Sequence, residues 1–191
     1  MGGYENKYYK KHYDECREWE KKIGSYIVEI LKIKSVIDLG CGIGSFLEGA
    51  YESGCTEILG IELNLKIADK YIEEKIKPYI QYGDLTVPLK LEKHFDCCIS
   101  FEVAEHLHEK NSQQFIDNLT EYTSKYIIMT AAPPGQRGTQ HFNLQERDYW
   151  IKRIEKKEFV YRKDLIEQCT KGWVDFEVPW YIFRNLMVFK K

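Results

Sequence analysis

The feature that most constrains the fold is a regular alternation of short β-rich runs with segments of helical spacing. The β-rich runs are residues 35–39, 57–62, 79–82, 95–101 and 126–132. The helical segments between them are residues 46–54, 65–76 and 115–122. Because strands that alternate with helices form βαβ units with right-handed crossovers, the sequence predicts an α/β fold with a mostly parallel sheet.

The two ends of the chain depart from this alternation. Residues 1–33 carry apolar side chains at helical spacing and predict an N-terminal helical lead-in that could act as a lid. Residues 174–180 and 185–191 both look extended, and only four residues separate them. Since four residues cannot hold a crossover helix, these two runs predict a C-terminal hairpin. We therefore expect seven strands, with one antiparallel strand in that hairpin.

Length and charge narrow the class of protein. The chain of 191 residues suits a single domain spanning residues 1–191. Its 28 Lys and Arg residues against 30 Asp and Glu residues give a net charge of −2, which argues against a broad basic surface for nucleic acid but not against a small site. No run approaches the ~18 apolar residues of a membrane span, and the charged N-terminus has no signal core. We expect a cytoplasmic protein (in the host cytoplasm, if the chain is viral).

Two residue types carry little functional signal. None of the six cysteines forms a Cys-x-x-Cys pair, so a zinc ribbon is not expected, and Cys97 and Cys98 lie in an apolar run typical of buried packing. His12 and His94 have no carboxylate pattern nearby, and we expect both at the surface.

A glycine-rich loop follows the first predicted strand. The run Asp38-Leu-Gly40-Cys-Gly42-Ile-Gly44 lies between a strand and a helix, where a loop of glycines lets the backbone approach a ligand. The same pattern can serve chain geometry alone. The dinucleotide fingerprint requires a glycine at position 45, and this chain has Ser45 there, with its third glycine one residue earlier.

Two further acids end the next two strands. Glu62 ends the second strand, where a carboxylate can accept both hydroxyls of a ribose, and Asp84 ends the third. Together with the glycine loop, these residues resemble the S-adenosylmethionine site of Rossmann-like class I methyltransferases, over about residues 35–132 and the terminal hairpin. The resemblance implies S-adenosyl-L-methionine as cofactor. The cofactor-binding residues that it implies are Asp38, Gly40, Gly42, Gly44, Glu62, Leu63, Asp84, Leu85 and Phe101.

A second group of polar residues follows the fourth strand. In the run Glu102-Val-Ala-Glu105-His106, a helical turn beginning at Glu102 would place Glu105 and His106 on the same face as Glu102. A solvated helix face can show the same spacing. His141 lies in a Pro- and Gly-rich segment that leaves the same sheet edge after the fifth strand.

These four residues, Glu102, Glu105, His106 and His141, resemble the metal site of small-RNA 3′-terminal 2′-O-methyltransferases. The Glu-Val-Ala-Glu-His-Leu run is also similar to that of ubiquinone-pathway O-methyltransferases. The resemblance implies a divalent metal that grips acceptor oxygens, with Glu105, His106 and His141 as catalytic residues. Mg²⁺ and Mn²⁺ are the candidates, with Fe²⁺ or Zn²⁺ also compatible with the two imidazoles. Without a metal, His106 or His141 could act as a general base.

Residues 133–163 are predicted to select the acceptor. The segment mixes amides, aromatic residues and Arg, which suits a polar acceptor, although an interface loop could have the same composition. It resembles methyltransferase domains that modify glycans, which implies a sugar, glycan or nucleotide-sugar partner. The N-terminal aromatics Tyr4, Tyr8, Tyr9, Tyr13 and Trp19 could close over the site or could simply pack on the sheet.

Three functions are therefore open. The first is S-adenosylmethionine-dependent O-methylation of a sugar or glycan, since a metal can chelate a vicinal diol. The second is 2′-O-methylation of an RNA 3′-terminal ribose, with catechol-like small molecules as a related alternative. Basic residues at 152–163 could touch RNA phosphates or form a solvated helix face. The third is a cofactor-binding subunit without catalysis.

Overall fold

The computed structural model describes residues 2–191, with side chains from residue 6 onward. Eight α-helices are assigned in this part of the chain: α1 (Gly2–Lys11), α2 (Arg17–Leu31), α3 (Ser45–Glu52), α4 (Leu65–Ala68), α5 (Ser112–Glu121), α6 (Arg147–Ile154), α7 (Lys163–Thr170) and α8 (Trp180–Asn185). The strands are β1 (Ser35–Leu39), β2 (Glu57–Glu62), β3 (Ile80–Tyr82), β4 (Phe95–Ser100), β5 (Thr123–Met129), β6 (Val160–Tyr161) and β7 (Met187–Lys190).

Shorter turns complete these elements. One is a π-helical turn, η1 (His12–Cys16), between α1 and α2. The others are 3₁₀ turns: η2 (Asp69–Tyr71), η3 (Lys77–Tyr79), η4 (Ala104–His106), η5 (Glu109–Asn111), η6 (Glu155–Lys157) and η7 (Trp173–Phe176). None of the helices in the described chain is long and apolar enough to cross a membrane.

The seven strands form one mixed sheet in the order β3-β2-β1-β4-β5-β7-β6. Neighbours from β3 to β5 are parallel, and Ile37 of β1 pairs with Leu59 on one side and Cys98 on the other. β7 runs antiparallel to both β5 and β6. The predicted α/β, Rossmann-like class I methyltransferase architecture with a mixed seven-stranded sheet is therefore confirmed.

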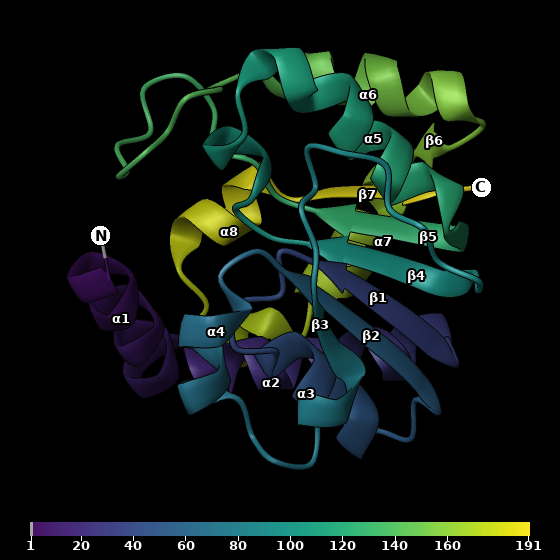
Figure 1. Cartoon of the computed structure of the whole chain (residues 1–191). Coiled ribbons are helices and arrows are strands. Elements are labelled where there is room, and N and C mark those ends of the chain that lie inside the picture. Colours follow the sequence, from purple (N-terminus) through teal and green to yellow (C-terminus); the bar gives the residue numbers. More distant parts are fainter. Residues whose placement is uncertain (1) are drawn as a thin grey trace.

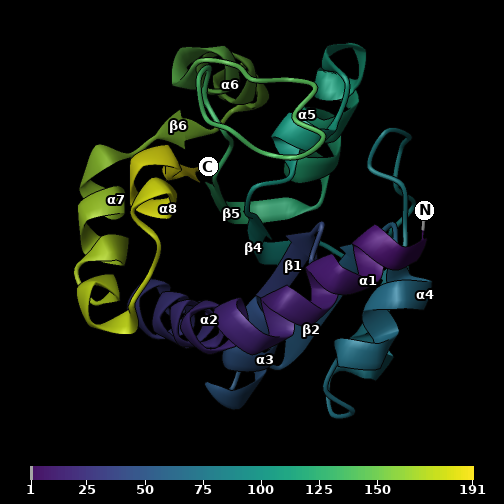
Figure 2. The same cartoon turned by 90° about the vertical axis from the view of Figure 1, so that its left-hand side faces the viewer.

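Helices cover both faces of the sheet. Figures 1 and 2 show α2 and α3 on one face and α5 and α6 on the other. Successive strand residues point to opposite faces, so Cys97 packs into the α2–α3 side and Cys98 into the α5–α6 side. Both cysteines are fully buried, and the apolar fourth run is a central strand covered on both faces.

The strand predicted at 174–180 is wrong. Residues there form η7 and the start of α8, and the edge strand that pairs with β7 is Val160–Tyr161. A two-residue strand is too short to show alternation, which explains why the sequence did not reveal it. The apolar side chains around 174–180 do not alternate between buried and exposed as those of a strand would. Trp173 and Ile182 are buried, while Val174 is 76% exposed.

Two predicted helices are shorter than expected. The run 65–76 gives only α4 and one 3₁₀ turn, after which Ile72 is extended. No helical turn begins at Glu102, because its φ of 52° lies in the left-handed region. The turn η4 begins two residues later at Ala104, so the same-face arrangement of Glu102, Glu105 and His106 does not arise from one helix.

Candidate active site

The predicted site residues gather around one cavity at the carboxyl edge of the parallel strands. Its volume is about 790 Å³, within the range of small-molecule pockets. All residues predicted to bind the cofactor except Gly44 line this cavity, and so do the four predicted metal ligands. The topology explains this convergence, because parallel strands deliver their carboxyl ends to one edge.

The glycine loop connects β1 to α3 through left-handed backbone. Gly40 has φ 82°, and a Cβ there would lie 2.5 Å from Val103 Cγ2, so only glycine fits. Gly42 has φ 56°, and a Cβ there would meet no atom within 4 Å. Since Gly42 lines the cavity, the missing side chain leaves open the space in which a cofactor would lie.

Glu62 at the end of β2 is held in a fixed orientation. The Gly42 N–H donates to Glu62 Oε2 at 2.9 Å, and the Asn64 N–H donates to Oε1 at 2.8 Å. The Tyr9 hydroxyl from α1 donates to the same Oε1 at 2.9 Å. The carboxylate is 6% exposed and faces the cavity, as a residue that accepts ribose hydroxyls should.

Asp38 at the end of β1 is 1% exposed, and its Oδ2 has no hydrogen-bond partner in the described chain. Burial raises the pKa of Asp38 well above its usual range, and the charges of Glu20 and Glu62 add to this effect. An orphaned buried carboxylate beside a cavity fits a ligand that carries positive charge, as a sulfonium or ammonium group does.

The third position predicted to bind the cofactor follows β3. Asp84 accepts hydrogen bonds at Oδ1 from the backbone and the hydroxyl of Thr86, at 2.8 and 2.7 Å. The buried Leu85 lies beside it, and the Asn118 amide of α5 donates to Leu85 O at 3.1 Å. Leu63 is 52% exposed at the rim. Opposite them, Phe101 packs edge-on against Phe46, with ring centroids 4.7 Å apart.

Glu102 is engaged by protein amides. Gln136 Nε2 donates to its Oε2 at 2.8 Å, and Asn185 Nδ2 donates to its Oε1 at 3.0 Å. Its strained backbone is tied by a hydrogen bond from the Glu102 N–H to Thr130 Oγ1 at 2.8 Å. Glu102 thus lines the cavity, but it is not part of the close group formed by Glu105, His106 and His141. Its role as a metal ligand stays a prediction.

The other three predicted ligands come together. One ligand atom from each of Glu105, His106 and His141 lies within 4.8 Å of the others, and the two rings are 5.1 Å apart. The loop that carries His141 is anchored here, since Glu105 O accepts from the Phe142 and Asn143 N–H groups at 2.8 and 3.1 Å. Tertiary packing, rather than helix periodicity, assembles the cluster.

Glu105 is a buried carboxylate without a hydrogen-bond partner among the described residues. Its side chain is 0% exposed. Burial, together with the charge of Glu102, raises the pKa of Glu105 to about 8. One carboxylate and two imidazoles form a donor set that Mn²⁺, Fe²⁺ or Zn²⁺ accepts, so the residues fit a divalent metal.

The N-terminal helix forms one wall of the cavity. Tyr8 and Tyr9 line it, and Tyr71 donates to the Asn6 side chain at 3.1 Å, which ties α1 to the turn after α4. Tyr13 instead packs against Tyr71, with ring centroids 6.2 Å apart, and the side chain of Tyr4 lies outside the described residues. This placement is compatible with a lid, which stays a prediction.

Sequence reasoning missed several residues of this site. Asn185 holds Glu102 from 83 positions away, and no local pattern signals such a partner. His12 was expected at the surface without a carboxylate nearby, but its Nδ1 lies 3.3 Å from Glu20 Oε1 and its ring is half-buried. Their separation of eight residues gave no signal, because residues eight apart on a regular α-helix diverge by about 80°.

The fold and the cavity define a class I S-adenosylmethionine-dependent methyltransferase. A family model described as a methyltransferase domain matches residues 9–160, so the chain belongs to that family. The chain is 25% identical over 181 residues to the mitochondrial ubiquinone biosynthesis O-methyltransferase of Dictyostelium discoideum. That match covers 87% of this chain and 52% of the relative, so the chain spans about half the length of that protein.

Solved structures agree on the fold. CalS10 with bound S-adenosylmethionine, an amino pentose methyltransferase from Micromonospora echinaspora, is 12% identical with a TM-score of 0.65, over 90% of this chain and 91% of that chain. The methyltransferase domain of bacterial CtHen1 is 21% identical with a TM-score of 0.61, over 90% and 97%. Magnesium protoporphyrin IX methyltransferase from Synechocystis, solved with S-adenosylhomocysteine, is 16% identical with a TM-score of 0.61, over 90% and 81%.

Proposed function

We propose that this methyltransferase methylates a hydroxyl of a sugar or glycan that carries two adjacent hydroxyls, with the help of a divalent cation. The observation that carries the proposal is Glu105, a fully buried carboxylate beside His106 and His141 whose two oxygens have no hydrogen-bond partner among the described residues. These groups share one cavity with the glycine loop and Glu62. Donor and acceptor sites therefore adjoin, as direct transfer between two bound molecules requires.

The contacts in the cavity suggest a role for each residue in the proposed reaction. S-adenosylmethionine supplies a methyl group on a sulfonium: its S–CH3 bond breaks as the acceptor oxygen bonds to the methyl carbon, S-adenosylhomocysteine leaves, and the hydroxyl proton passes to solvent. A cation at the Glu105 cluster would lower the pKa of that hydroxyl. Gly42 leaves space for the cofactor, Glu62 offers its carboxylate to the ribose, and Asp84 with Leu85 meets the adenine. Glu105, His106 and His141 hold the cation, and Glu102, fixed by two amides, borders them. The acceptor is thereby aligned with the methyl group in a site that the surrounding loops partly enclose.

The rim of the cavity favours a sugar over an RNA end. Trp180 is 68% exposed at the rim and carries the Arg184 guanidinium 4.7 Å above its ring, while Gln140 and Arg137 add hydrogen-bonding groups. Of the basic residues predicted to touch phosphates, Lys157 pairs with Asp117 instead, at 2.7 Å. None of the basic side chains between 152 and 163 lines the cavity of the described chain. CalS10, a protein of the same fold, is described as an amino pentose methyltransferase, which supports a sugar acceptor.

Metal binding tests the proposal without knowledge of the acceptor. Titration of the full chain with Mn²⁺, followed by the electron paramagnetic resonance signal of free Mn²⁺, should show a site whose affinity falls by about 100-fold in Glu105→Gln and His141→Ala. His108→Gln is the matched control, because His108 is an exposed histidine that stacks on Phe142 outside the cluster. Affinity for S-adenosylhomocysteine should stay within about twofold in all three variants.

Turnover then identifies the acceptor class. Release of S-adenosylhomocysteine is measured with nucleotide sugars, a neutral oligosaccharide, catechol and an oligoribonucleotide with a free 3′ end. We expect turnover with a sugar, its loss with a chelator and its rescue by one cation. Turnover that survives both the chelator and Glu105→Gln would refute the role of a metal in the reaction. Exclusive turnover of the oligoribonucleotide, with a steep salt dependence, would refute the sugar.

A further inference from the structure

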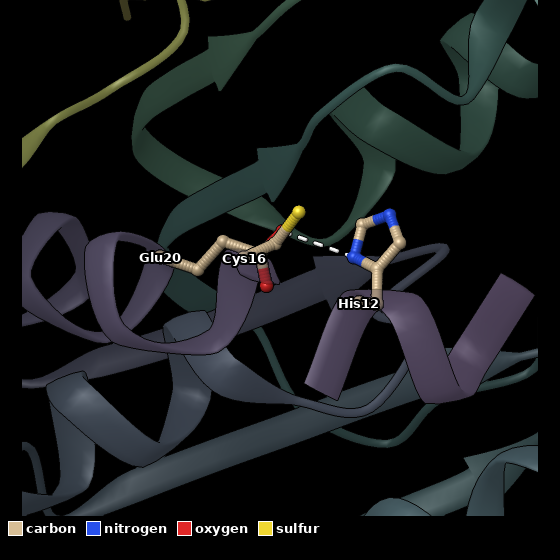
Figure 3. Close-up of side chains that lie close together, drawn as sticks. All are labelled: His12, Cys16 and Glu20. Atoms are coloured by element: carbon tan, nitrogen blue, oxygen red, sulfur yellow. Dashed lines mark ion pairs between the residues drawn. The ribbon is translucent and has the colours of Figure 1, made fainter. Parts of the chain in front are cut away.

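A second group of side chains with metal-ligand chemistry, His12, Cys16 and Glu20, lies on the N-terminal wall of the cavity. Figure 3 shows His12, Cys16 and Glu20 pointing toward one another. Their ligand atoms, one nitrogen, one sulfur and one oxygen, all lie within 4.8 Å of one another. His12 Nδ1 is 3.3 Å from Glu20 Oε1, and all three residues line the cavity.

The backbone at this point has an unusual conformation that aligns the three side chains. His12–Cys16 is a π-helical turn, a rare conformation that occurs frequently at functional sites. In an α-helix each step of four residues rotates a side chain by about 40°, so residues eight apart would diverge by about 80°. A π turn is wider and holds more residues, so the step from His12 to Cys16 falls short of a full turn and offsets the extra rotation of the α-helical step from Cys16 to Glu20. α2 then places Glu20 one turn beyond Cys16.

The ionisable groups around these side chains are mainly acidic. Glu20 is 6% exposed, and within residues 6–191 its one close ionisable partner across an ion-pair distance is the imidazole of His12. Asp38 and Glu62, both buried, line the same cavity. A buried carboxylate is costly unless it is paired or coordinates a metal, and no lysine or arginine pairs with Glu20 in the described chain.

We propose that His12, Cys16 and Glu20 bind a zinc ion. A thiolate, an imidazole and a carboxylate suit Zn²⁺, whereas Mg²⁺ prefers oxygen ligands alone. Bonds of about 2.0–2.3 Å in a tetrahedron separate ligand atoms by about 3.3–3.8 Å, a spacing that His12 Nδ1 and Glu20 Oε1 already have. Since all the ligand atoms lie within 4.8 Å of one another, the others need to close by at most about 1.5 Å. Binding releases the thiol proton to solvent. The fourth position faces the cavity, where water completes the tetrahedron, and this site is independent of the cluster at Glu105.

The test uses the full chain carrying His141→Ala, which removes one ligand of the Glu105 cluster and so weakens its metal binding. Zn²⁺ alone, measured by competition with a chromophoric chelator, should bind with one equivalent. Cys16→Ser should weaken that binding by at least about 100-fold, and Glu20→Gln by at least about tenfold. Cys55→Ser is the control, because Cys55 lies outside the group and its Sγ donates to the Glu57 backbone carbonyl. Co²⁺ in place of Zn²⁺ should give a thiolate charge-transfer absorption that is lost only in Cys16→Ser.

Circular dichroism and thermal melting establish that each variant is folded. The proposal is wrong if folded Cys16→Ser binds Zn²⁺ as tightly as its parent, or if the Co²⁺ spectrum lacks the thiolate band. It is also wrong if neither the parent nor its variants bind Zn²⁺. If metal-free Glu20→Gln then binds S-adenosylhomocysteine more weakly than the parent, Glu20 serves the cofactor directly. None of these outcomes changes the Mn²⁺ result for Glu105, so the zinc proposal and the proposed function can be refuted independently.

Discussion

Replacing Gly42 with alanine should separate cofactor binding from stability. Gly42 has φ 56°, and a non-glycine residue in this region costs about 1–2 kcal/mol. Its added Cβ would meet no protein atom within 4 Å, so no further packing cost arises in the free protein. The same holds for Gly54, which has φ 83° and equally open space at the end of α3. Gly42→Ala and Gly54→Ala should therefore lose similar free energies of unfolding, about 1–2 kcal/mol each.

The two variants should differ in cofactor affinity. Gly42 lines the cavity, so its Cβ would occupy space that the cofactor needs, whereas Gly54 does not line it. We expect Gly42→Ala to weaken the binding of S-adenosylhomocysteine by at least about tenfold, or about 1.4 kcal/mol, and Gly54→Ala to leave it unchanged. Urea unfolding and isothermal titration calorimetry measure the two quantities. Equal affinities in both variants would refute the placement of the cofactor against the glycine loop.

Two further predictions concern stability and pH. Burial alone would raise the pKa of Glu48, but hydrogen bonds from Lys75 and Lys21 lower it below its ordinary value. Its contribution to stability is therefore present above the unfolded pKa of about 4.3 and is lost as the pH falls through the folded pKa, so Glu48→Gln should flatten the acid limb of a denaturation profile. Asn118→Ala should lower the free energy of unfolding by about 2–3 kcal/mol and weaken cofactor binding, because it leaves Leu85 O and Leu89 N without partners.

Matched variants sharpen these two tests. An acid limb of Glu48→Gln as steep as that of the unmodified chain would contradict the assigned pKa direction. Asn118→Asp retains the acceptor for Leu89 N but buries a carboxylate against Leu85 O, so the free energy of unfolding should fall by at least as much as in Asn118→Ala. A smaller fall in Asn118→Asp than in Asn118→Ala, or an unchanged affinity for S-adenosylhomocysteine, would show that Asn118 does not hold the loop after Asp84.

Local patterns were sufficient wherever a segment's structure depends on its own residues. β2 begins and ends at the predicted residues, and β1 and the glycine loop follow the run 35–44, because buried parallel strands and left-handed turns impose strict residue types. By contrast, the strand 160–161 has only two residues and owes its conformation to pairing with β7. Its position could be found only once the partner was in place.

The candidate site shows the same division. By itself the sequence determined the fold class, the glycine loop and the acids that end successive strands, since parallel topology sends all of these to one edge. Only the tertiary structure decided that Glu105 is buried without a partner, that Asn185 holds Glu102 and that a π turn brings His12 toward Glu20. The physical reason is that burial and hydrogen-bond partners depend on residues distant in sequence, whereas periodicity and backbone preference depend on near neighbours.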